Sequence, residues 1–113
     1  MVARINALFI CSRNQWRSPT AEALFKGSAA VSARSAGTSP SARVRVNEKH
    51  IRWADIVFVM EKRHRQQLLD RLGDTLRGKR VVVLDVPDDF QFMDETLISL
   101  LKQRLAAHIA VPD

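Results

Sequence analysis

Three short apolar runs, separated by helical patterns, constrain the fold of this chain more than any other feature. They are INALFIC at 5–11, DIVFVM at 55–60 and RVVVLDV at 80–86. Their apolar residues are continuous rather than alternating, which is typical of strands that helices cover on both faces. A fourth, weaker candidate strand is AVSARSAG at 30–37. The runs therefore predict a small parallel sheet buried between layers of helix.

Helical periodicity fills the segments between and after these runs. In SPTAEALFKG at 18–27, Ser18 is the expected N-cap, Pro19 the first helical residue and Gly27 the stop. The other expected helices are a short one capped by Asn47, one at 61–73 that ends at Gly73, and one at 94–109 capped by Asp94. Strands that alternate with helices predict one α/β domain over 1–113, with a four-stranded parallel sheet in three layers.

Composition excludes several classes of protein. The single cysteine, Cys11, excludes an intramolecular disulfide and favours a reducing, cytoplasmic location. The three histidines are scattered without ligand spacing, so we expect no metal and no cofactor. No apolar run approaches the roughly 20 residues that cross a bilayer. A formal net charge of +6 suits an anionic partner such as phosphate, a phosphorylated protein or nucleic acid, although a solvated basic surface would carry the same charge.

The stretch CSRNQWRSP at 11–19 lies between a predicted strand and a predicted helix, where parallel α/β folds bind ligands. Backbone N–H groups of such a loop, together with the helix N-terminus, can hold an anion. Arg17 can donate two parallel hydrogen bonds to phosphate. Over this loop Cys11 would be largely thiolate at neutral pH, with Ser18 bonded to its sulfur. The alternative is that Cys11 is a small buried hydrophobe and Arg17 a surface residue.

Two residues inside this loop, Arg13 and Trp16, leave alternatives open. Arg13 stands where a glycine would give backbone freedom, so it either distorts the loop or adds a second positive arm. Asn14 is the non-glycine residue that best tolerates left-handed backbone. Trp16 either stacks on an aromatic substrate at the rim or packs against neighbouring residues.

The segment ALFICSRNQWRSPTAEALF resembles the opening of the low-molecular-weight protein tyrosine phosphatases, whose signature is Cys-x5-Arg-Ser/Thr followed by Pro. SAGT at 35–38, WADIVFVME at 53–61 and VPDDF at 86–90 resemble further motifs of that family, so the resemblance covers nearly the whole chain. It implies a flavodoxin-like fold. It also implies hydrolysis of a phosphomonoester, with phosphotyrosine among the candidates, through a cysteinyl-phosphate intermediate. The implied partner is a phosphorylated protein or small molecule.

The resemblance also assigns residues to roles. It implies Cys11 as the nucleophile, Arg17 as the phosphate clamp and Asp88 as the general acid. The implied phosphate-binding loop comprises Ser12, Arg13, Asn14, Gln15, Trp16 and Ser18, and Ser35 supports Asn14. Family members usually carry Asp-Pro, whereas this chain has Asp88 and Asp89 after a proline, so Asp89 is the alternative acid.

The chain also departs from the family pattern. It is shorter, and the missing residues lie between Thr38 and Ser41, a segment that forms a wall of the substrate cleft in the family. Ser41 stands at the place of a supporting histidine. Phe90 and Phe92 replace tyrosines of the acid loop, and Trp16 replaces a second cysteine. These differences leave the substrate open, and Cys11 lacks the partner that would protect it from overoxidation.

Three other functions share parts of this pattern. Arsenate reductases on the same scaffold need further cysteines, which this chain lacks, and sugar-transport phosphocarrier domains lack the arginine-serine ending. A catalytically weak or inactive module that binds phosphate, a phosphoprotein or nucleic acid is the main alternative. Its basic residues would be Arg43, Arg45, Lys49 and Arg52. Aromatic residues are only 6% of the chain and no nucleic-acid motif is present, which argues against a nucleic-acid partner.

Overall fold

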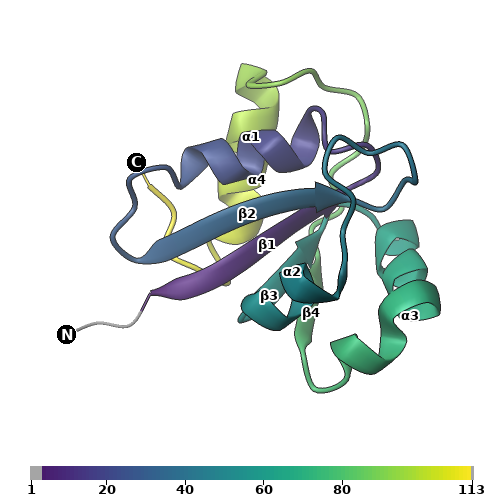
Figure 1. Ribbon diagram of the computed structural model, residues 1–113. Helices are drawn as coiled ribbons and strands as arrows, with labels where there is room; N and C mark the ends of the chain where they lie inside the picture. Colours follow the sequence, from purple (N-terminus) through teal and green to yellow (C-terminus); the bar gives the residue numbers. More distant parts are fainter. Residues whose placement is uncertain (1–3, 113) are drawn as a thin grey trace.

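A central sheet of four parallel strands, in the order β2-β1-β3-β4, forms the middle of the molecule (Figure 1). The computed structural model describes residues 4–112. The strands are β1 (Ile5–Cys11), β2 (Val31–Gly37), β3 (Ile56–Val59) and β4 (Arg80–Val83), and the helices are α1 (Arg17–Leu24), α2 (Glu48–Trp53), α3 (Lys62–Leu76) and α4 (Glu95–Leu105). Each apolar run of the sequence forms a strand, including the weaker candidate. The predicted four-stranded parallel α/β fold is confirmed.

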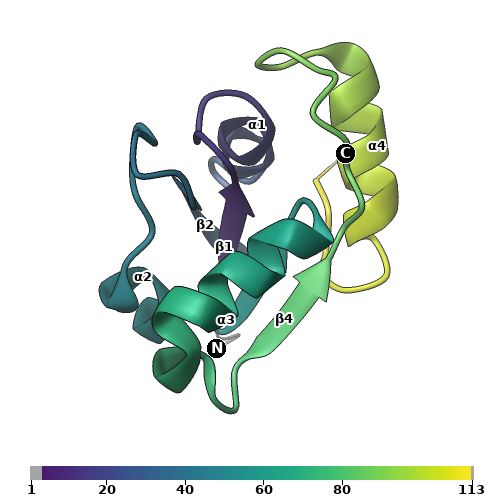
Figure 2. The same cartoon turned by 90° about the vertical axis from the view of Figure 1, so that its right-hand side faces the viewer.

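The helices cover both faces of the sheet. Figure 2 shows α1 and α4 on one face and α2 and α3 on the other. The buried residues divide in the same way, into one cluster beneath α1 and α4 and a second beneath α2 and α3. Because β1 and β3 lie inside the sheet and are covered on both faces, their residues are almost wholly buried. The three layers match the flavodoxin-like prediction.

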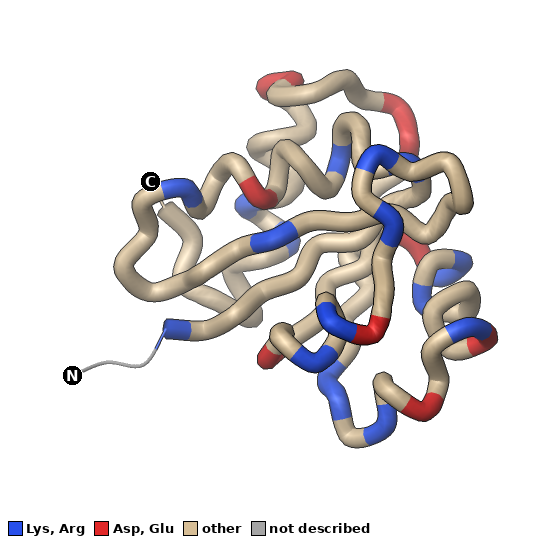
Figure 3. The backbone as a smooth tube through the Cα atoms, viewed as in Figure 1, with Lys and Arg blue, Asp and Glu red and all other residues tan. Residues whose placement is uncertain are grey.

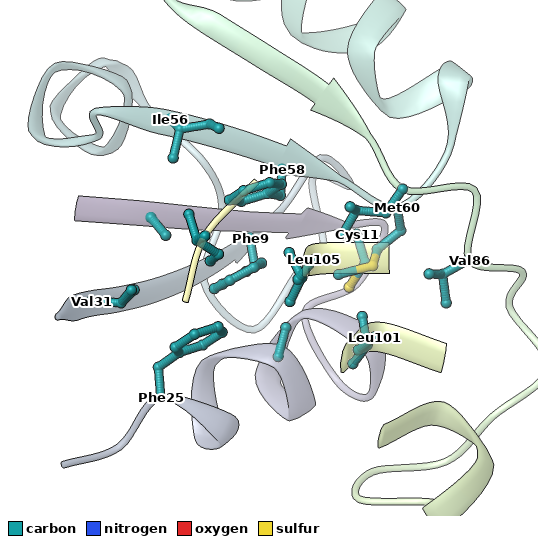
Figure 4. Close-up of a cluster of buried hydrophobic side chains, with 14 of the residues drawn as sticks. Phe9, Cys11, Phe25, Val31, Ile56, Phe58, Met60, Val86, Leu101 and Leu105 are labelled. Atoms are coloured by element: carbon teal, nitrogen blue, oxygen red, sulfur yellow. The ribbon is translucent and has the colours of Figure 1, made fainter. Parts of the chain in front are cut away.

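The core beneath α1 and α4 is built around stacked aromatic rings. Phe9 of β1 lies between Phe25 and Phe58, with ring centroids 5.7 and 5.4 Å apart (Figure 4). Leu101 and Leu105 of α4 pack onto the same cluster, as the leucine spacing in the sequence predicts. Cys11 lies at the end of this cluster, so the core fixes the strand that carries it.

Three predictions of helix boundaries are wrong, and one of them is the end of α4, which lies at Leu105 rather than at residue 109. Helix α1 begins at Arg17 with Trp16 as its N-cap, and Ser18 lies inside the first turn, where its side chain bonds other partners. Gly73 does not end α3, because the helix bends at Leu72 and continues to Leu76. The positive φ that a glycine supplies after a helix occurs instead at Gly78, where φ is 78°.

The topology places the carboxyl ends of β1 and β2 side by side. Residues of the two strands pair in parallel register from Ile5 with Val31 to Cys11 with Gly37. The loops that follow both strands therefore meet at one edge of the sheet, together with the segment after β4. Among residues 4–112, no helix has both the length and the apolar composition to cross a membrane.

Candidate active site

Cys11 ends the central strand β1 at the bottom of a small pocket of about 110 Å³. Only 3% of the residue is exposed, and its Sγ lies 2.9 Å from the Ser18 Oγ. The pocket is lined by Cys11, Ser12, Arg13, Gln15, Trp16, Arg17 and Asp88. The structure thus brings the cysteine, the arginine and one carboxylate of the sequence prediction to a single cavity.

Asn14 holds the loop in shape from the buried side. Its backbone has a φ of 56°, the left-handed conformation that its residue type tolerates. Its Nδ2 donates to the Ser18 Oγ and to the Ser35 Oγ, both at 2.9 Å. The Ser35 hydroxyl in turn donates to the Glu22 carboxylate. Because Ser18 accepts from Asn14, its own proton is available to the Cys11 sulfur at 2.9 Å or to Ala36 O at 3.4 Å.

The outer side of the loop is bonded to the segment 38–43 that follows β2. The carbonyl oxygens of Cys11, Ser12 and Arg13 accept from the backbone N–H groups of Thr38, Ser39 and Arg43 at 2.9–3.0 Å, and Asn14 O accepts from Arg43 Nε at 3.0 Å. In a trans peptide the N–H of the next residue points opposite to the carbonyl. The N–H groups of residues 12–15 therefore point opposite to the carbonyl groups that this segment bonds. The shortened segment thus supports the loop.

Gly37 allows this close approach. A Cβ at this position would lie 2.5 Å from Ser12 O and 2.8 Å from the Ala42 Cβ, closer than side chains tolerate. Its backbone also pairs outward, because Gly37 N donates to Val44 O and Gly37 O accepts from Val46 N. The glycine of SAGT is therefore required by packing between two backbone segments.

Arg17 is 2% exposed and its guanidinium is held at one end. Its Nη1 donates to the Glu61 Oε2 at 2.5 Å and to Val86 O at 2.8 Å. Its Nε lies 3.5 Å from the Asp88 Oδ1. The Nε–Nη2 edge, whose two N–H bonds are parallel, therefore remains for a ligand in the pocket that Arg17 lines.

Glu61 anchors this guanidinium, a role that no sequence pattern indicated. Burial by itself would raise its pKa, but hydrogen bonds from Arg63 and Arg17 outweigh burial and lower the pKa of the Glu61 carboxyl to about 2. The carboxylate is therefore ionised throughout the neutral range. It compensates the buried positive charge of Arg17.

His64, at the start of α3, bonds the opposite side of the loop. Its Nδ1 accepts from the Glu61 backbone N–H at 3.1 Å, which places the proton of the neutral ring on Nε2. Nε2 then donates to the Ser12 Oγ at 2.9 Å. Burial, with smaller contributions from Arg17 and Arg63, lowers the pKa of His64 to about 4. The ring is a fixed neutral donor at neutral pH.

The two candidate acids differ in their relation to the pocket. Asp88 lines the pocket beside Arg17, and its side chain is 51% exposed. Asp89 is exposed and does not line the pocket. Both lie in the irregular segment 84–94, where Asp85 and Met93 have positive φ values. The geometry therefore distinguishes two neighbours that the sequence left as alternatives.

The rim of the pocket carries the residues that differ from the family pattern. Trp16 is 43% exposed and Arg13 is exposed, and both line the pocket. The Ser41 hydroxyl bonds the Ser39 hydroxyl rather than the phosphate-binding loop. None of the four residues of the basic group lines the pocket, neither Arg43 nor Arg45, Lys49 and Arg52. Within residues 4–112, no three His, Cys, Asp or Glu side chains gather to hold a metal ion.

No family model matches this chain, and no curated protein matches it. Solved structures do match. The tyrosine phosphatase Wzb from Escherichia coli K30, in complex with phosphate, is 22% identical at a TM-score of 0.73, covering 93% of this chain and 96% of that one. A low-molecular-weight phosphotyrosine phosphatase from Vibrio cholerae O395 is 19% identical at a TM-score of 0.70, and the match covers 91% of this chain and 93% of that one. The YwlE arginine phosphatase from Geobacillus stearothermophilus is 21% identical at a TM-score of 0.68, and the match covers 90% of this chain and 86% of that one. This protein therefore has the fold of the low-molecular-weight protein tyrosine phosphatases.

Proposed function

We propose that this protein is a divergent low-molecular-weight phosphatase that hydrolyses phosphomonoesters through a cysteinyl-phosphate intermediate. The observation that carries the proposal is the Cys11 sulfur. It lies 2.9 Å from the Ser18 hydroxyl, in a pocket that Arg17 and Asp88 also line. A buried structural cysteine needs neither a hydroxyl aimed at its sulfur nor an arginine beside it.

In the first step the Cys11 thiolate attacks phosphorus, a P–S bond forms and the P–O bond to the leaving group breaks. The N–H groups of residues 12–15 and the Nε–Nη2 edge of Arg17 hold the nonbridging oxygens. Asp88, as the protonated acid, gives its proton to the leaving oxygen. The contact of 3.5 Å between Asp88 and Arg17 keeps the acid beside the phosphate that Arg17 would bind.

In the second step Asp88, now ionised, takes a proton from water, and the oxygen of that water attacks phosphorus. The P–S bond breaks, and the Ser18 proton stabilises the departing thiolate. Asn14 donates to the Ser18 oxygen, which leaves the Ser18 proton for the shorter of its two other contacts, the Cys11 sulfur, in both steps. The reaction consumes one water and yields inorganic phosphate.

A phosphate-binding module without turnover is the second candidate. It is favoured by Arg13, whose charge at the rim would strengthen anion binding, and by the open segment that carries Asp88, whose side chain is 51% exposed. Such a module would use the same N–H groups and the same arginine. It differs only in lacking the two chemical steps.

The deciding experiment is a release assay with p-nitrophenyl phosphate, a phosphotyrosine peptide and free phosphoarginine, the last because one structural neighbour is an arginine phosphatase. We expect phosphate release from at least one of these, abolished in Cys11→Ser. The binding module predicts no release by the wild-type protein, together with phosphate binding that Cys11→Ser retains.

A further inference from the structure

An open groove of about 820 Å³ leads away from the phosphate pocket, between α1 and the edge strand β2. Gln15 and Trp16 line both the pocket and the groove, so the two spaces are continuous. The groove follows α1 from Trp16 to Lys26, about 15 Å at the helical rise of about 1.5 Å per residue. An extended peptide rises about 3.3 Å per residue, so the groove has room for about four or five residues.

The end of the groove nearest the pocket is apolar. Trp16 and Phe92 are 43% and 53% exposed, and they rank among the most exposed large apolar side chains of the described residues. Pro19 and Ala23 of α1 continue the apolar floor. Exposed aromatic side chains grouped at the mouth of a site commonly mark a contact surface rather than a solvated face.

The charge of the groove is positive. Arg4 and Lys26 line its far end and Arg43 lines the end near the pocket, whereas Glu22 is the one acid among its lining residues. Glu22 accepts a hydrogen bond from Ser35, so part of its carboxylate is already engaged. Basic positions lie near both ends of β2 (Figure 3). An acidic ligand is therefore favoured.

The edge of β2 also offers backbone groups. Ala30 O accepts from Ile5 N of β1, so odd-numbered residues of β2 turn their N–H and C=O outward, away from β1. Val31 is covered at one end by Ser28 and Arg4, and Gly37 is covered at the other by the segment 44–46. Between these covered ends, Ala33 lines the groove with its outward groups available to an extended chain.

We propose that this groove binds an acidic, extended segment of a phosphorylated polypeptide, next to the phosphorylated residue whose side chain enters the pocket. The inference rests on the proposed function and names its substrate class as a polypeptide with acidic flanks. Apolar flanking side chains contact Trp16 and Phe92, and acidic ones meet Arg4 and Lys26. A nucleic acid would use the charge but would gain nothing from the strand edge.

Binding to the Cys11→Ser protein tests the groove without turnover. The probes are one phosphotyrosine peptide with glutamate flanks, the same peptide with lysine flanks, and single-stranded oligothymidine. Binding of each probe is measured by the changes in the amide chemical shifts of the protein. We expect the glutamate peptide to shift Ala23, Lys26 and Ala33, and the lysine peptide to shift only residues 12–17. Shifts confined to the loop for both peptides, or tighter groove binding by oligothymidine, would overturn the proposal.

Two charge reversals at helix C-terminal ends give a matched pair. Lys26 follows α1 and lines the groove, whereas Arg104 lies in the last turn of α4 and does not line the groove, so the two variants are Lys26→Glu and Arg104→Glu. We expect Lys26→Glu to lower the affinity for the glutamate peptide, relative to the affinity for the lysine peptide, about fivefold. Arg104→Glu should leave this ratio of affinities unchanged. Equal effects of both reversals would contradict a local site.

Turnover separates this proposal from the proposed function. For each variant, kcat/KM for the two peptides is divided by its value for p-nitrophenyl phosphate. If wild-type protein turns over the peptides but treats both flanks alike, the groove proposal fails and the phosphatase stands. If no phosphate is released while groove shifts persist, the phosphatase fails and the groove stands as a binding site.

Discussion

The proposed phosphate-binding loop at 11–18 and the proposed acid segment at 84–94 both contribute residues to one pocket but are built differently. The loop is tightly held: Asn14 and Ser18 are fully buried, and the segment 38–43 donates hydrogen bonds to the loop's carbonyl groups. The acid segment is irregular, and Asp88 is half exposed. The proposed anion site is therefore preorganised, whereas the proposed proton donor lies in the exposed stretch 87–89.

Arg17 connects these two regions. Its Nη1 bonds Val86 O of the acid segment, and its Nε lies beside Asp88. Glu61 holds the same guanidinium from α3. Substitution of Arg17 should therefore disturb both regions. Substitution of Asp88 should affect only proton transfer, and substitution of the residues that support the loop should affect only the anion site.

Arg17→Lys should have the largest effect. Lysine keeps the charge but cannot bond Glu61 and Val86 while presenting a parallel pair of donors. We expect kcat/KM for p-nitrophenyl phosphate to fall about 10³-fold. Arg63→Lys is the control, because Arg63 also bonds Glu61 but is exposed, and its loss should be below about threefold. Equal losses in the two variants would show that Glu61, rather than the Arg17 fork, carries the effect.

Asp88→Asn should affect only the proton-transfer half of the site. For substrates with poor leaving groups we expect kcat to fall about 10²-fold, with a smaller loss for p-nitrophenyl phosphate. Steady-state rates across leaving groups of different basicity measure this. Asp89→Asn is the neighbouring control. If Asp89→Asn reproduces the dependence on leaving group and Asp88→Asn does not, the acid is Asp89.

Gly37→Ala should damage only the preorganised loop. The added methyl group would lie 2.5 Å from Ser12 O, so we expect a loss of about 2 kcal/mol in the free energy of unfolding. Denaturant unfolding measures the loss. Gly73→Ala is the matched control, because no atom lies within 4 Å of its added Cβ and the position is helical, so it should not destabilise. A neutral Gly37→Ala would contradict the tight contact between loop and segment 38–43.

His64 should give the smallest effect, visible in the pH dependence of stability. Its pKa is about 4 in the folded protein and 6.5 in a model compound, so the unfolded chain binds more protons between these values. The stabilising contribution is therefore present above pH 6.5 and is lost as pH falls toward 4. Between pH 7.5 and 5.5 we expect a loss of about 1 kcal/mol.

His64→Gln isolates this contribution, because glutamine can still donate to Ser12 but does not titrate. The difference in unfolding free energy between the wild type and this variant should shrink as pH falls from 7.5 to 5.5. A pH-independent difference would mean that the ring of His64 does not remain neutral in the folded state. Glu61, with a pKa of about 2, stays ionised over this range and does not confound the comparison.

Most of the fold could be predicted from local patterns. Continuous apolar runs identified β1, β3 and β4, β2 was a weaker candidate, and leucine spacing identified the face of α4 that packs onto Phe9 and Phe58. The boundaries were less predictable where a side chain had another task. Ser18 is a good capping residue by type, but its hydroxyl bonds Cys11 and Asn14, so the helix starts before it.

The candidate site was predictable only where its residues are close in sequence. The loop from Cys11 to Ser18 is one contiguous pattern, and its strand-to-helix position follows from the flanking runs. Glu61 and His64 are separated from the loop by more than forty residues, and their sequence pattern indicates only the charged first turn of a helix. The signal that could have found them is the EKRH sequence directly after a buried strand, because strand ends converge in a parallel sheet.

The most direct test of the central claim is to trap the intermediate. Asp88→Asn protein is mixed with p-nitrophenyl phosphate, quenched in acid and analysed by peptide mass spectrometry. An activated leaving group permits the first step, while loss of the Asp88 base slows the second, so we expect one phosphoryl group on Cys11 and none in the same variant carrying Cys11→Ser. Phosphate release without phosphorylated Cys11, or release that survives Cys11→Ser, would contradict the role of this cysteine as the nucleophile.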